Sequence, residues 1–357
     1  MLEVFKVAIV GASGYTGGEL LRILAVHPKV EVKVATSREY AGKPVYYAHP
    51  HLRGIYRRLK FTKLESPEQL ADVVGDVDLV FLALPHKVSL HFVPKALEIG
   101  LKVVDLSADY RLKRIEDYKR WYGYEHPYPD LLEKAVYGIP ELYGEKIKGA
   151  QLVANPGCNA TSSILAVVPI ASAGFIDLDH LVVDVKVGSS EAGAKPYRGG
   201  HHPEREGTAR PYDASGHRHV AELEQAIRDF TGKDVRVGFT PHAVSMIRGS
   251  LASAYSWLTK DVKDLDVQRA YAKFYAGKPF IKIIRGPPMP YPDVKNVYGS
   301  NYAEVGFALD KRVGRLAMFA AIDNLMKGAA GVAVQNMNLM LGIEEDEGLK
   351  YLMPVRP

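Results

Sequence analysis

The sequence predicts an α/β protein: a Rossmann-type doubly wound parallel sheet, followed by a second α+β domain built on a mixed sheet. Strand-like apolar runs alternate with helical patterns through the first 155 residues, as in a sheet with helices on both faces. Beyond residue 155 the runs alternate apolar and polar positions, as half-buried strands do. With 357 residues, 47% of them hydrophobic, the chain is too long for one core of ordinary size, so we expect two domains.

The first domain is expected over residues 1–155. Its first strand is the apolar run KVAIV at 6–10, and the turn GASGYTG separates this strand from an amphipathic helix with Leu20, Leu21 and Leu24 on one side. The next elements predicted are a strand at 30–36, a strand at 78–84, a helix at 93–100 and a strand at 102–106. This alternation favours parallel strands joined by right-handed crossovers.

The second domain is expected over residues 156–322 and begins with a helix from Asn159. Its strands are predicted at 181–187, 236–241, 250–258 and 303–310. The segment at 189–219 is rich in glycine, histidine and charge and is too long for an idle connection, so we interpret it as a binding loop. A long helix packed through small residues is predicted at 323–342.

Composition and charge exclude several classes of protein. The first residues lack the basic flank and cleavage site of a signal peptide, and nowhere do about 18 apolar residues run together, so we expect a soluble cytoplasmic protein. Cys158 is the single cysteine, which excludes an internal disulfide and a thiolate zinc cluster. The net charge of +5 fits acidic small molecules or an acidic protein partner and does not require nucleic acid.

No metal site is expected. The histidines that might suggest one are irregularly spaced, and no helix carries an HExxH-like pattern. These histidines are His201, His202, His217, His219 and His242.

The glycine turn predicts a dinucleotide site. Gly11, Gly14 and Gly17 follow the first strand directly and stand at the mouth of the first helix, where free amides and the helix dipole can hold a pyrophosphate. The spacing is GxxGxxG, and the predicted strand before it and helix after it support the interpretation. The residues expected to bind the cofactor in this turn are Gly11, Ser13, Gly14, Tyr15, Thr16 and Gly17.

The end of the second predicted strand favours NADP. An acidic residue there usually holds a ribose 2′-hydroxyl and would repel a 2′-phosphate; here the segment reads ATSRE, in which Ser37 and Arg38 can donate hydrogen bonds and charge to a 2′-phosphate. The alternative is that Arg38 is a turn residue that faces solvent.

Cys158 has the setting of a nucleophile. It follows Pro156 and Gly157 and precedes a helix, so free amides at the helix start can stabilise its thiolate. A thiolate beside a nicotinamide implies one chemistry above others: an activated acyl group forms a thioester, which hydride then reduces to an aldehyde. A lone cysteine can also be an inert core residue.

The same chemistry requires an acid and base, and GHRH at 216–219 supplies His217 and His219. Either could instead cap or pack the helix that follows. Two histidines within three residues at the end of the long loop favour a catalytic role for one of them, and we favour His219.

Several blocks occur in the order of a known family. Through these blocks the chain resembles, over nearly its whole length, the N-acetyl-gamma-glutamyl-phosphate reductase family, which is related to aspartate-semialdehyde dehydrogenases. The blocks are FLALPH at 81–86, DLSADYRL at 105–112, YGIPEL at 137–142, ANPGC at 154–158, GHRH at 216–219, FTPHAVSMIRG at 239–249, YGSNY at 298–302 and DNLMKGAAG at 323–331.

The resemblance implies roles for particular residues. Cys158 would accept the acyl group, and His219 would be the general acid and base with His217 adjacent. Further contacts of the cofactor would come from Pro85 and Asn324. The residues implied to hold the phosphate or the substrate carboxylate are Ser107, Arg111, Asn155, Ser190 and Arg248.

Some of these implications leave alternatives open. Either of the arginines, Arg111 or Arg248, could form a structural ion pair instead. The resemblance also implies that the C-terminal helix and the residues after it, 323–357, complete the NADP-binding domain, and that the enzyme is a homodimer or homotetramer.

Departures from the family pattern concern the acyl end of the pocket. They are Asn159 and Ala160 in place of a Tyr-Pro pair, Val187, Glu191 and Ala194 in a loop that is usually SGxSGAGR, and Lys87 in place of Gly. These variants resemble the subgroup that reduces a 2-aminoadipyl or glutamyl phosphate tethered to a small acidic carrier protein, in lysine and arginine biosynthesis. The smaller pair after the cysteine and the basic segment PYRGGHHPER would give a carrier tail space and charge.

Three other functions remain as alternatives. One is N-acetyl-gamma-glutamyl-phosphate reductase itself. A second is aspartate-semialdehyde dehydrogenase, against which the HRH block and the NLMKGAAG segment argue. The third is a non-catalytic regulator that senses NADP, which would not need Cys158 together with the histidine pair. The sequence does not choose between five- and six-carbon substrates, because one methylene shifts affinity by only about 1–3 kcal/mol.

Overall fold

The computed structural model describes residues 4–356 and divides the chain into two compact units. The first unit holds the described residues up to Ile115 together with Glu125–Pro156 and Ala329–Leu352. The second unit holds Glu116–Tyr124, Gly157–Gly328 and the described residues from Met353 onward. The chain therefore crosses between units immediately before Cys158.

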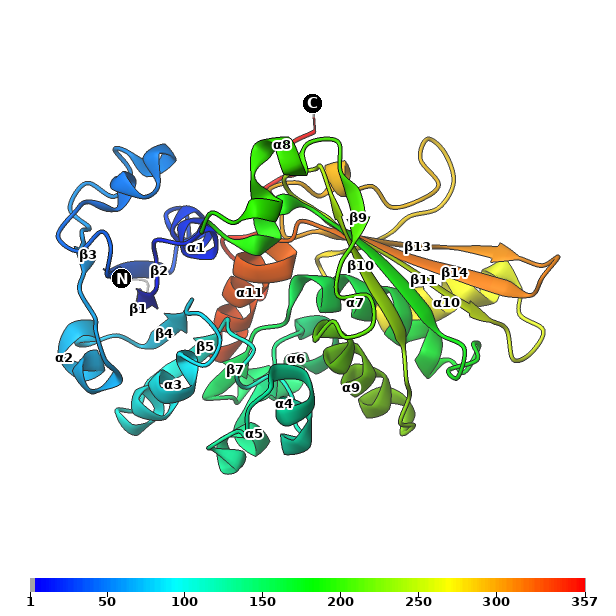
Figure 1. Ribbon diagram of the computed structural model, residues 1–357, viewed down its shortest axis with the longest axis horizontal. Helices are drawn as coiled ribbons and strands as arrows, with labels where there is room; N and C mark the ends of the chain where they lie inside the picture. Colours follow the sequence, from blue (N-terminus) through cyan, green and yellow to red (C-terminus); the bar gives the residue numbers. More distant parts are fainter. Residues whose placement is uncertain (1–3, 357) are drawn as a thin grey trace. The chain divides into compact units, whose positions relative to one another are not determined.

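A parallel sheet forms the centre of the first unit (Figure 1). All of its paired strands run parallel, which confirms the predicted Rossmann-type sheet. In sheet order the strands are β3 (Phe61–Thr62), β2 (Val30–Thr36), β1 (Phe5–Val10), β4 (Leu79–Leu82), β5 (Lys102–Asp105), β7 (Leu152–Ala154) and β6 (Val136–Tyr137). Because β1 pairs with β2 on one side and β4 on the other, the strand order reverses beside β1. Ligands of such sheets bind outside the carboxyl ends of the strands at this point.

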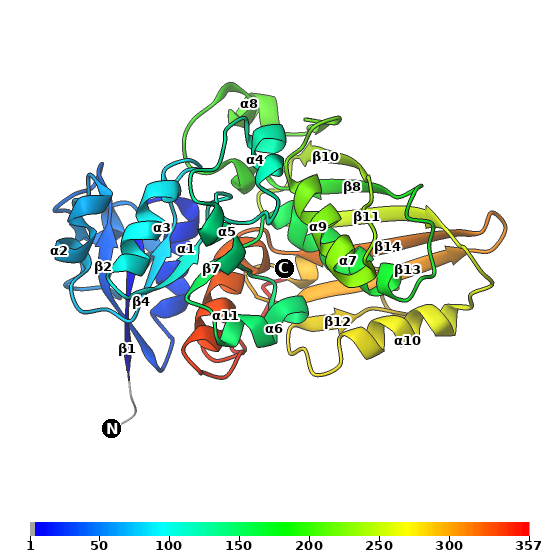
Figure 2. The same ribbon diagram turned by 90° about the horizontal axis from the view of Figure 1, so that it is seen from below.

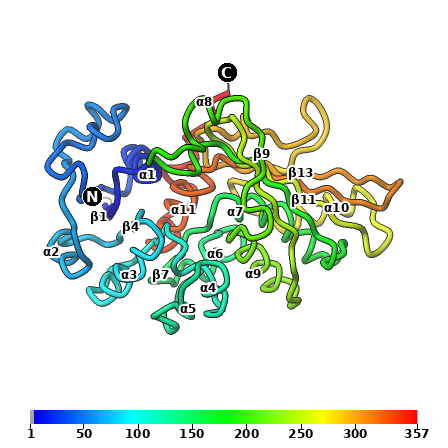
Figure 3. The backbone as a smooth tube through the Cα atoms, viewed as in Figure 1, coloured from blue at the N-terminus to red at the C-terminus, as the bar shows by residue number. Residues whose placement is uncertain are grey.

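Helices cover both faces of this sheet, as expected of a doubly wound fold. The helices are α1 (Tyr15–Leu24), α2 (Leu70–Val74), α3 (Ser89–Glu98), α5 (Pro129–Lys134), α6 (Pro140–Lys148) and α11 (Gly331–Met340). α2 and α3 lie together on the face opposite α1 (Figures 1 and 2). The tube in Figure 3 shows α11, from the C-terminal end of the chain, beside α1 from its beginning.

Helix α3 begins four residues before the predicted start at residue 93. The predicted start came too late because Pro94 lies inside the helix, where its nitrogen cannot donate to the carbonyl of Leu90. The Tyr110 hydroxyl donates to that carbonyl instead, at 2.9 Å, so the helix continues through the proline with the acceptor satisfied.

The second unit contains a mixed sheet, as predicted. In sheet order its strands are β12 (Ile281–Ile283), β13 (Ala303–Asp310), β14 (Arg315–Ile322), β11 (Ser250–Trp257), β8 (Val182–Val187), β10 (Gly238–Val244) and β9 (Ala209–Pro211). β10 is parallel to β8 and β12 is parallel to β13, while the other neighbours are antiparallel. The sequence did not predict β14, because its alanines and methionine give neither an alternating pattern nor a strong strand propensity.

Helices pack on one face of the mixed sheet and place the candidate residues. α7 (Cys158–Ser172) contacts β11 and β14, and α9 (His219–Thr231) packs against α7 (Figures 1 and 2). α10 (Asp264–Phe274) also lies against α7. α7 begins at Cys158 and α9 begins at His219, so two helices that pack together carry the two candidate catalytic side chains.

Two predicted segments differ from the structure. The segment at 189–219 holds a short helix, α8 (His202–Arg205), and strand β9, which extends the sheet beside β10. The long helix predicted at 323–342 is present over residues 326–340, but its first turn, Met326–Ala330, is π-helical and leads directly into α11. Small residues allow both conformations, and π turns often occur at functional sites. Among the described helices, none combines the length and apolarity that a membrane crossing needs.

Candidate active site

The glycine turn of the first unit has the shape of a pyrophosphate site. Gly11 has φ 83°, and a Cβ there would overlap the Ala83 carbonyl oxygen. A Cβ on Gly17 would lie 2.6 Å from the Ala12 backbone, whereas one on Gly14 would meet nothing within 4 Å. The outer glycines therefore allow tight packing, and the middle one opens the space before α1. Gly14 caps α1 without a side-chain hydrogen bond, so the first amides of the helix remain open to an anion.

Residues at the end of β2 extend this site. Ser37 Oγ donates to Ser13 Oγ at 2.9 Å, which joins the glycine turn to the segment after β2. The Arg38 guanidinium donates to the carbonyls of Leu64 and Glu65, at 3.4 and 2.7 Å. Arg38 is exposed and lies in a bend, so the alternative of a solvent-facing turn residue stays open, and its contact with a cofactor stays a prediction.

Arg38 lines a pocket of about 420 Å³ in the first unit, together with Lys87, His91, Lys95 and Tyr128. Lys87 adopts φ 68°, a conformation that favours glycine, which explains the glycine common at this position in the resembled family. Its backbone amide donates to Asp109 Oδ1 at 2.9 Å. The lining also contains Glu65 and Glu68, so the pocket is mixed in charge, and it is the open glycine turn that fits the pyrophosphate of a dinucleotide.

The remaining cofactor candidates are placed as follows. Tyr15 and Thr16 open α1 directly after the glycine turn, and Pro85 follows β4 beside that turn. Asn324 lies in the second unit, where it accepts from the Gly249 amide at 2.8 Å and donates to Ser190 Oγ at 2.9 Å. Its contact with a cofactor stays a prediction.

Cys158 is the first residue of α7, and its side chain is half-buried. Gly157 caps the helix without a side-chain hydrogen bond, and the first helical amide bond runs from Thr161 to the Gly157 carbonyl. The amides at the start of α7 are therefore available to a negative charge at the sulfur. The backbone of Gly328 lies against the cysteine, since a Cβ there would be 2.7 Å from Cys158 Cβ.

His219 faces the turn before Cys158. A Cβ on Gly157 would lie 2.5 Å from His219 Nε2, so the absence of a side chain at Gly157 leaves room for the imidazole. Glu222 is fully buried, and its Oε2 accepts from the Gly157 amide at 3.0 Å, while its Oε1 lies 4.0 Å from His219 Nε2. Glu222 thus connects the turn before Cys158 to the histidine. Glu222 was not among the residues predicted from the sequence, although its position three residues after His219 places both on one face of α9.

His217 has a different role from His219. Its Nδ1 accepts a hydrogen bond from the His219 backbone amide at 3.2 Å, and its ring stacks on Phe239 with centroids 5.6 Å apart. Burial, reinforced by the charge of Arg218, lowers the pKa of His217 to about 4. His217 is therefore neutral near pH 7 and orients the backbone of its neighbour.

Asn159 organises the other side of the thiol. Its Oδ1 lies 3.7 Å from the Cys158 sulfur and also accepts from Ser250 Oγ at 3.3 Å. Its Nδ2 donates to the Tyr212 hydroxyl at 3.3 Å. The residue that departs from the usual Tyr-Pro pair therefore joins Cys158, β11 and the long loop in one polar network.

Three of the predicted substrate residues brace the end of β5 and β7 in the first unit. Arg111 donates to the Asn155 carbonyl at 2.7 Å and to the Leu106 carbonyl at 3.2 Å. The Ser107 hydroxyl donates to Asp105 at 2.7 Å, and burial raises the pKa of Asp105 to about 6. The Asn155 side chain donates to the Ala329 carbonyl at 3.0 Å. These contacts fix the strand that leads to Cys158, and contact with substrate stays a prediction.

The other two substrate candidates, Ser190 and Arg248, lie together in the second unit. Ser190 Oγ donates to the Ile247 carbonyl at 2.7 Å. Arg248 forms an ion pair with the fully buried Asp323 at 3.1 Å, so the structural alternative considered for this arginine is present. Among residues 4–356, no three His, Cys, Asp or Glu side chains form a group that could hold a metal ion.

Comparisons with known proteins bear on these arrangements. The model of the semialdehyde dehydrogenase NAD-binding domain matches residues 6–150, and the model of the dimerisation domain matches residues 158–324. A relative from Ignicoccus hospitalis, described as a putative [LysW]-L-2-aminoadipate/[LysW]-L-glutamate phosphate reductase, is 86% identical over 99% of each chain. The chain belongs to the semialdehyde dehydrogenase family.

Further relatives agree with this membership. A [LysW]-L-2-aminoadipate/[LysW]-L-glutamate phosphate reductase from Saccharolobus solfataricus is 58% identical over the whole of both chains. The family consists of oxidoreductases, so this chain is an enzyme, and the alternative of a non-catalytic regulator is wrong.

Solved structures share the fold. An aspartate semialdehyde dehydrogenase from Candida albicans, crystallised with NADP, has a TM-score of 0.70 at 17% identity and matches 94% of this chain and 98% of its own. The corresponding enzyme II of Vibrio cholerae has a TM-score of 0.69 at 18% identity, over 95% and 99% of the two chains. At these identities the likeness shows the two-domain fold alone.

Replacing Gly157 by alanine should displace His219 and lower kcat/KM of this semialdehyde dehydrogenase by about 100-fold, because an imidazole shifted by about 1 Å no longer meets the reacting group. Gly216→Ala is the matched control, since its added methyl would meet nothing within 4 Å. Steady-state kinetics on both variants tests this expectation. Equal activity of Gly157→Ala and wild type would contradict it.

His217 should stay uncharged as the pH falls from 8 to about 5, because burial lowers its pKa from 6.5 to about 4. The neutral form of the imidazole is therefore favoured more in the folded state than in the unfolded state, where the pKa is 6.5. This contribution to stability is fully present above pH 6.5 and is lost as the pH falls toward 4. NMR titration measures the pKa of His217, whose imidazole resonances are those missing from the spectrum of His217→Gln. A midpoint near 6.5 would contradict the expectation.

Proposed function

We propose that the protein is an NADPH-dependent reductase that converts a carrier-bound 2-aminoadipyl or glutamyl phosphate to the semialdehyde, with release of phosphate, in lysine and arginine biosynthesis. The observation that carries this proposal is the placement of Cys158 at the start of α7 with His219 Nε2 against the Gly157 backbone. A thiolate stabilised by helix amides, with an imidazole beside it, suits acyl transfer to sulfur.

The residues suggest a definite order of events. The Cys158 thiolate attacks the acyl carbon, the bond from that carbon to the phosphate oxygen breaks, and phosphate leaves with the bonding electrons. Amides at the start of α7 lie where negative charge resides on the attacking sulfur. When bound, the nicotinamide cofactor supplies the hydride that reduces the thioester carbon. His219 then protonates the sulfur as the aldehyde departs.

Glu222 and His217 are positioning residues in this proposal. Glu222 holds the Gly157 amide and faces His219, so the imidazole and the turn before the nucleophile keep one geometry. His217 accepts from the His219 amide and stays neutral, which favours His219 over His217 as the acid and base.

A carrier-bound substrate is supported by the relatives and by the residues around Cys158. The relatives at 86%, 58% and 57% identity carry [LysW] in the names of their substrates. Asn159 and Ala160 leave more space after the cysteine than a Tyr-Pro pair. The loop before α8 carries basic residues that suit an acidic carrier. These features favour the carrier-linked substrate over an N-acetylated one.

NADP is favoured as the cofactor because Ser37 and Arg38 follow β2, where they can donate hydrogen bonds and charge to a 2′-phosphate. We also infer a homodimer or homotetramer, since residues 158–324 match a dimerisation domain. A single cysteine that the proposed reaction needs as a thiol suits the reducing cytoplasm, where we place the reaction.

Replacing Cys158 by serine should abolish phosphate-dependent NADP reduction by the carrier-bound aldehyde while NADP binding is retained, because only the acyl acceptor is lost. His219→Asn should lower kcat by about 100-fold or more through loss of the acid and base. His180→Asn is the matched control, since His180 lies in the same unit, exposed and paired with Asp177. The assay compares carrier-bound, N-acetylated and aspartyl substrates. Full activity of Cys158→Ser would exclude the covalent route.

A further inference from the structure

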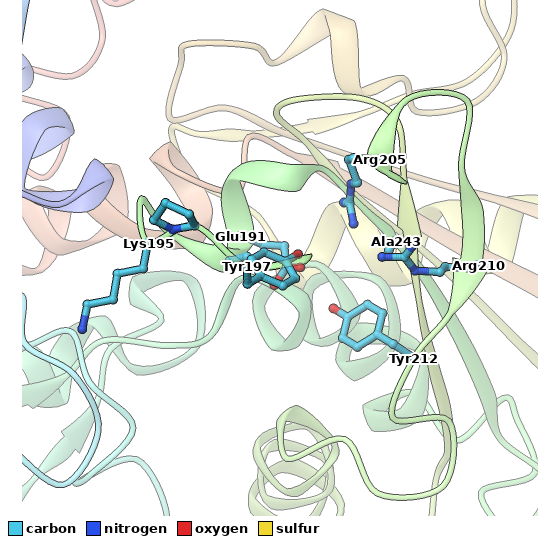
Figure 4. Close-up of a pocket in the computed structure, with 9 residues that line it drawn as sticks. Glu191, Lys195, Tyr197, Arg205, Arg210, Tyr212 and Ala243 are labelled. Atoms are coloured by element: carbon cyan, nitrogen blue, oxygen red, sulfur yellow. The ribbon is translucent and has the colours of Figure 1, made fainter. Parts of the chain in front are cut away.

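The second unit contains a pocket of about 430 Å³ formed by the long loop and the edge of the mixed sheet. Figure 4 shows the side chains of Arg205, Arg210 and Tyr212 turned toward the same space, while Lys195 extends away from it. Glu191 is the acidic residue in the lining, so basic groups outnumber acidic ones there. A pocket of this composition suits an anion.

Arg205 is the buried member of this group, with 5% of its surface exposed. It belongs to α8, and its Nη2 donates to the Val187 carbonyl at 3.1 Å. Its Nε is buried and has no hydrogen-bond partner in the part of the chain that the structure describes. Burying a guanidinium edge without an acceptor is costly, which indicates that a ligand completes the contact.

Neighbouring groups keep Arg205 turned to the pocket. Arg210 donates to the carbonyls of Glu204 and Gly199, at 3.3 and 3.0 Å, so the loop that carries α8 is tied to β9. Glu191 lines the same pocket; burial raises the pKa of its carboxyl, and the charge of Arg205 lowers it. Because Arg205 Nε has no hydrogen-bond partner among the described residues, this edge of the guanidinium is open to another carboxylate.

The pocket adjoins the nucleophile through Tyr212. The Tyr212 hydroxyl accepts from Asn159 Nδ2 at 3.3 Å, and Asn159 Oδ1 lies 3.7 Å from the Cys158 sulfur. Burial and the nearby charges of Glu191 and Cys158 raise the pKa of Tyr212, so its hydroxyl stays neutral. Tyr212 lines the pocket and reaches the thiol through Asn159, so an acyl chain bound at Cys158 can extend past Tyr212 toward Arg205.

We propose that Arg205 binds the α-carboxylate of the acyl chain in this pocket and thereby selects substrates that carry it. This inference rests on the proposed function. The Nε and Nη2 edge of a guanidinium matches a carboxylate in a side-on, two-point contact. The α-carboxylate is common to 2-aminoadipyl and glutamyl chains, so recognition at this group serves substrates of either length.

The test combines one change in the protein with one change in the substrate. Phosphate-dependent NADP reduction is measured with carrier-bound 2-aminoadipate 6-semialdehyde and with carrier-bound 5-aminopentanal, which lacks only the α-carboxylate. Loss of the carboxylate should lower kcat/KM of the wild type by about 30-fold, and Arg205→Gln should lose a similar factor on the first substrate. Arg205→Gln should then handle the two aldehydes about equally.

Controls separate recognition from structure. Arg312→Gln removes an exposed charge from the same unit, outside the basic loop, and should leave the 30-fold preference intact. Arg205→Lys keeps a cation without the fork and should recover part of the preference. If Arg205→Gln lowers activity on both aldehydes by the same factor, or if the wild type shows no preference, the inference is overturned. A wild type that turns over neither aldehyde would instead refute the proposed function.

Discussion

The hydrogen bond from the Gly157 amide to the buried carboxylate of Glu222 is the constraint on which the site depends. The Gly157 amide lies at the point where the chain enters the second unit, and no helix or strand partner is available to it there. A buried carboxylate binds such an amide more strongly than a neutral acceptor does. Since Glu222 follows His219 by one turn of α9, the same contact places the histidine beside the start of α7, where Cys158 stands.

Around this contact the polar residues divide into those that can meet a substrate and those that hold the frame. Hydrogen bonds to other groups of the chain occupy His217, Ser250 and Arg111. Cys158 begins a helix whose first amides are open, and Arg205 keeps its buried Nε directed to a pocket while its Nη2 donates to the Val187 carbonyl. Asn159 connects the two regions, because its amide reaches both the sulfur and Tyr212.

The sequence could predict the parts of the fold that repeat a regular pattern. The strands at 30–36 and 303–310 match β2 and β13 residue for residue, because strand-forming residues and clear boundaries coincide there. β14 was not predicted because its small residues have little strand propensity of their own. Pairing with β11 and β13 on either side holds this segment in the sheet. The helix expected from Asp323 begins at Met326 with a π turn, a conformation that leaves no periodic signal in the sequence.

For the site, motifs pointed to the proposed nucleophile but not to the groups that lie beside it. Cys158 and the histidine pair were found from their settings, whereas Glu222 and Arg205 look like ordinary charged residues until the fold brings them to Gly157 and to the pocket. Conversely, Ser107, Arg111 and Arg248 stand in recognisable blocks but form contacts within their own units. A sequence shows which polar groups exist, and only the fold shows which of them are already used.

Mass spectrometry of protein quenched during turnover tests the central claim most directly. With the carrier-bound acyl phosphate present and NADPH withheld, the peptide that contains Cys158 should gain the mass of the carrier-acyl group through a thioester, and hydroxylamine should remove it. If the substrate is consumed on addition of NADPH but no adduct ever forms at Cys158, the sulfur is not the acyl acceptor and the account is wrong.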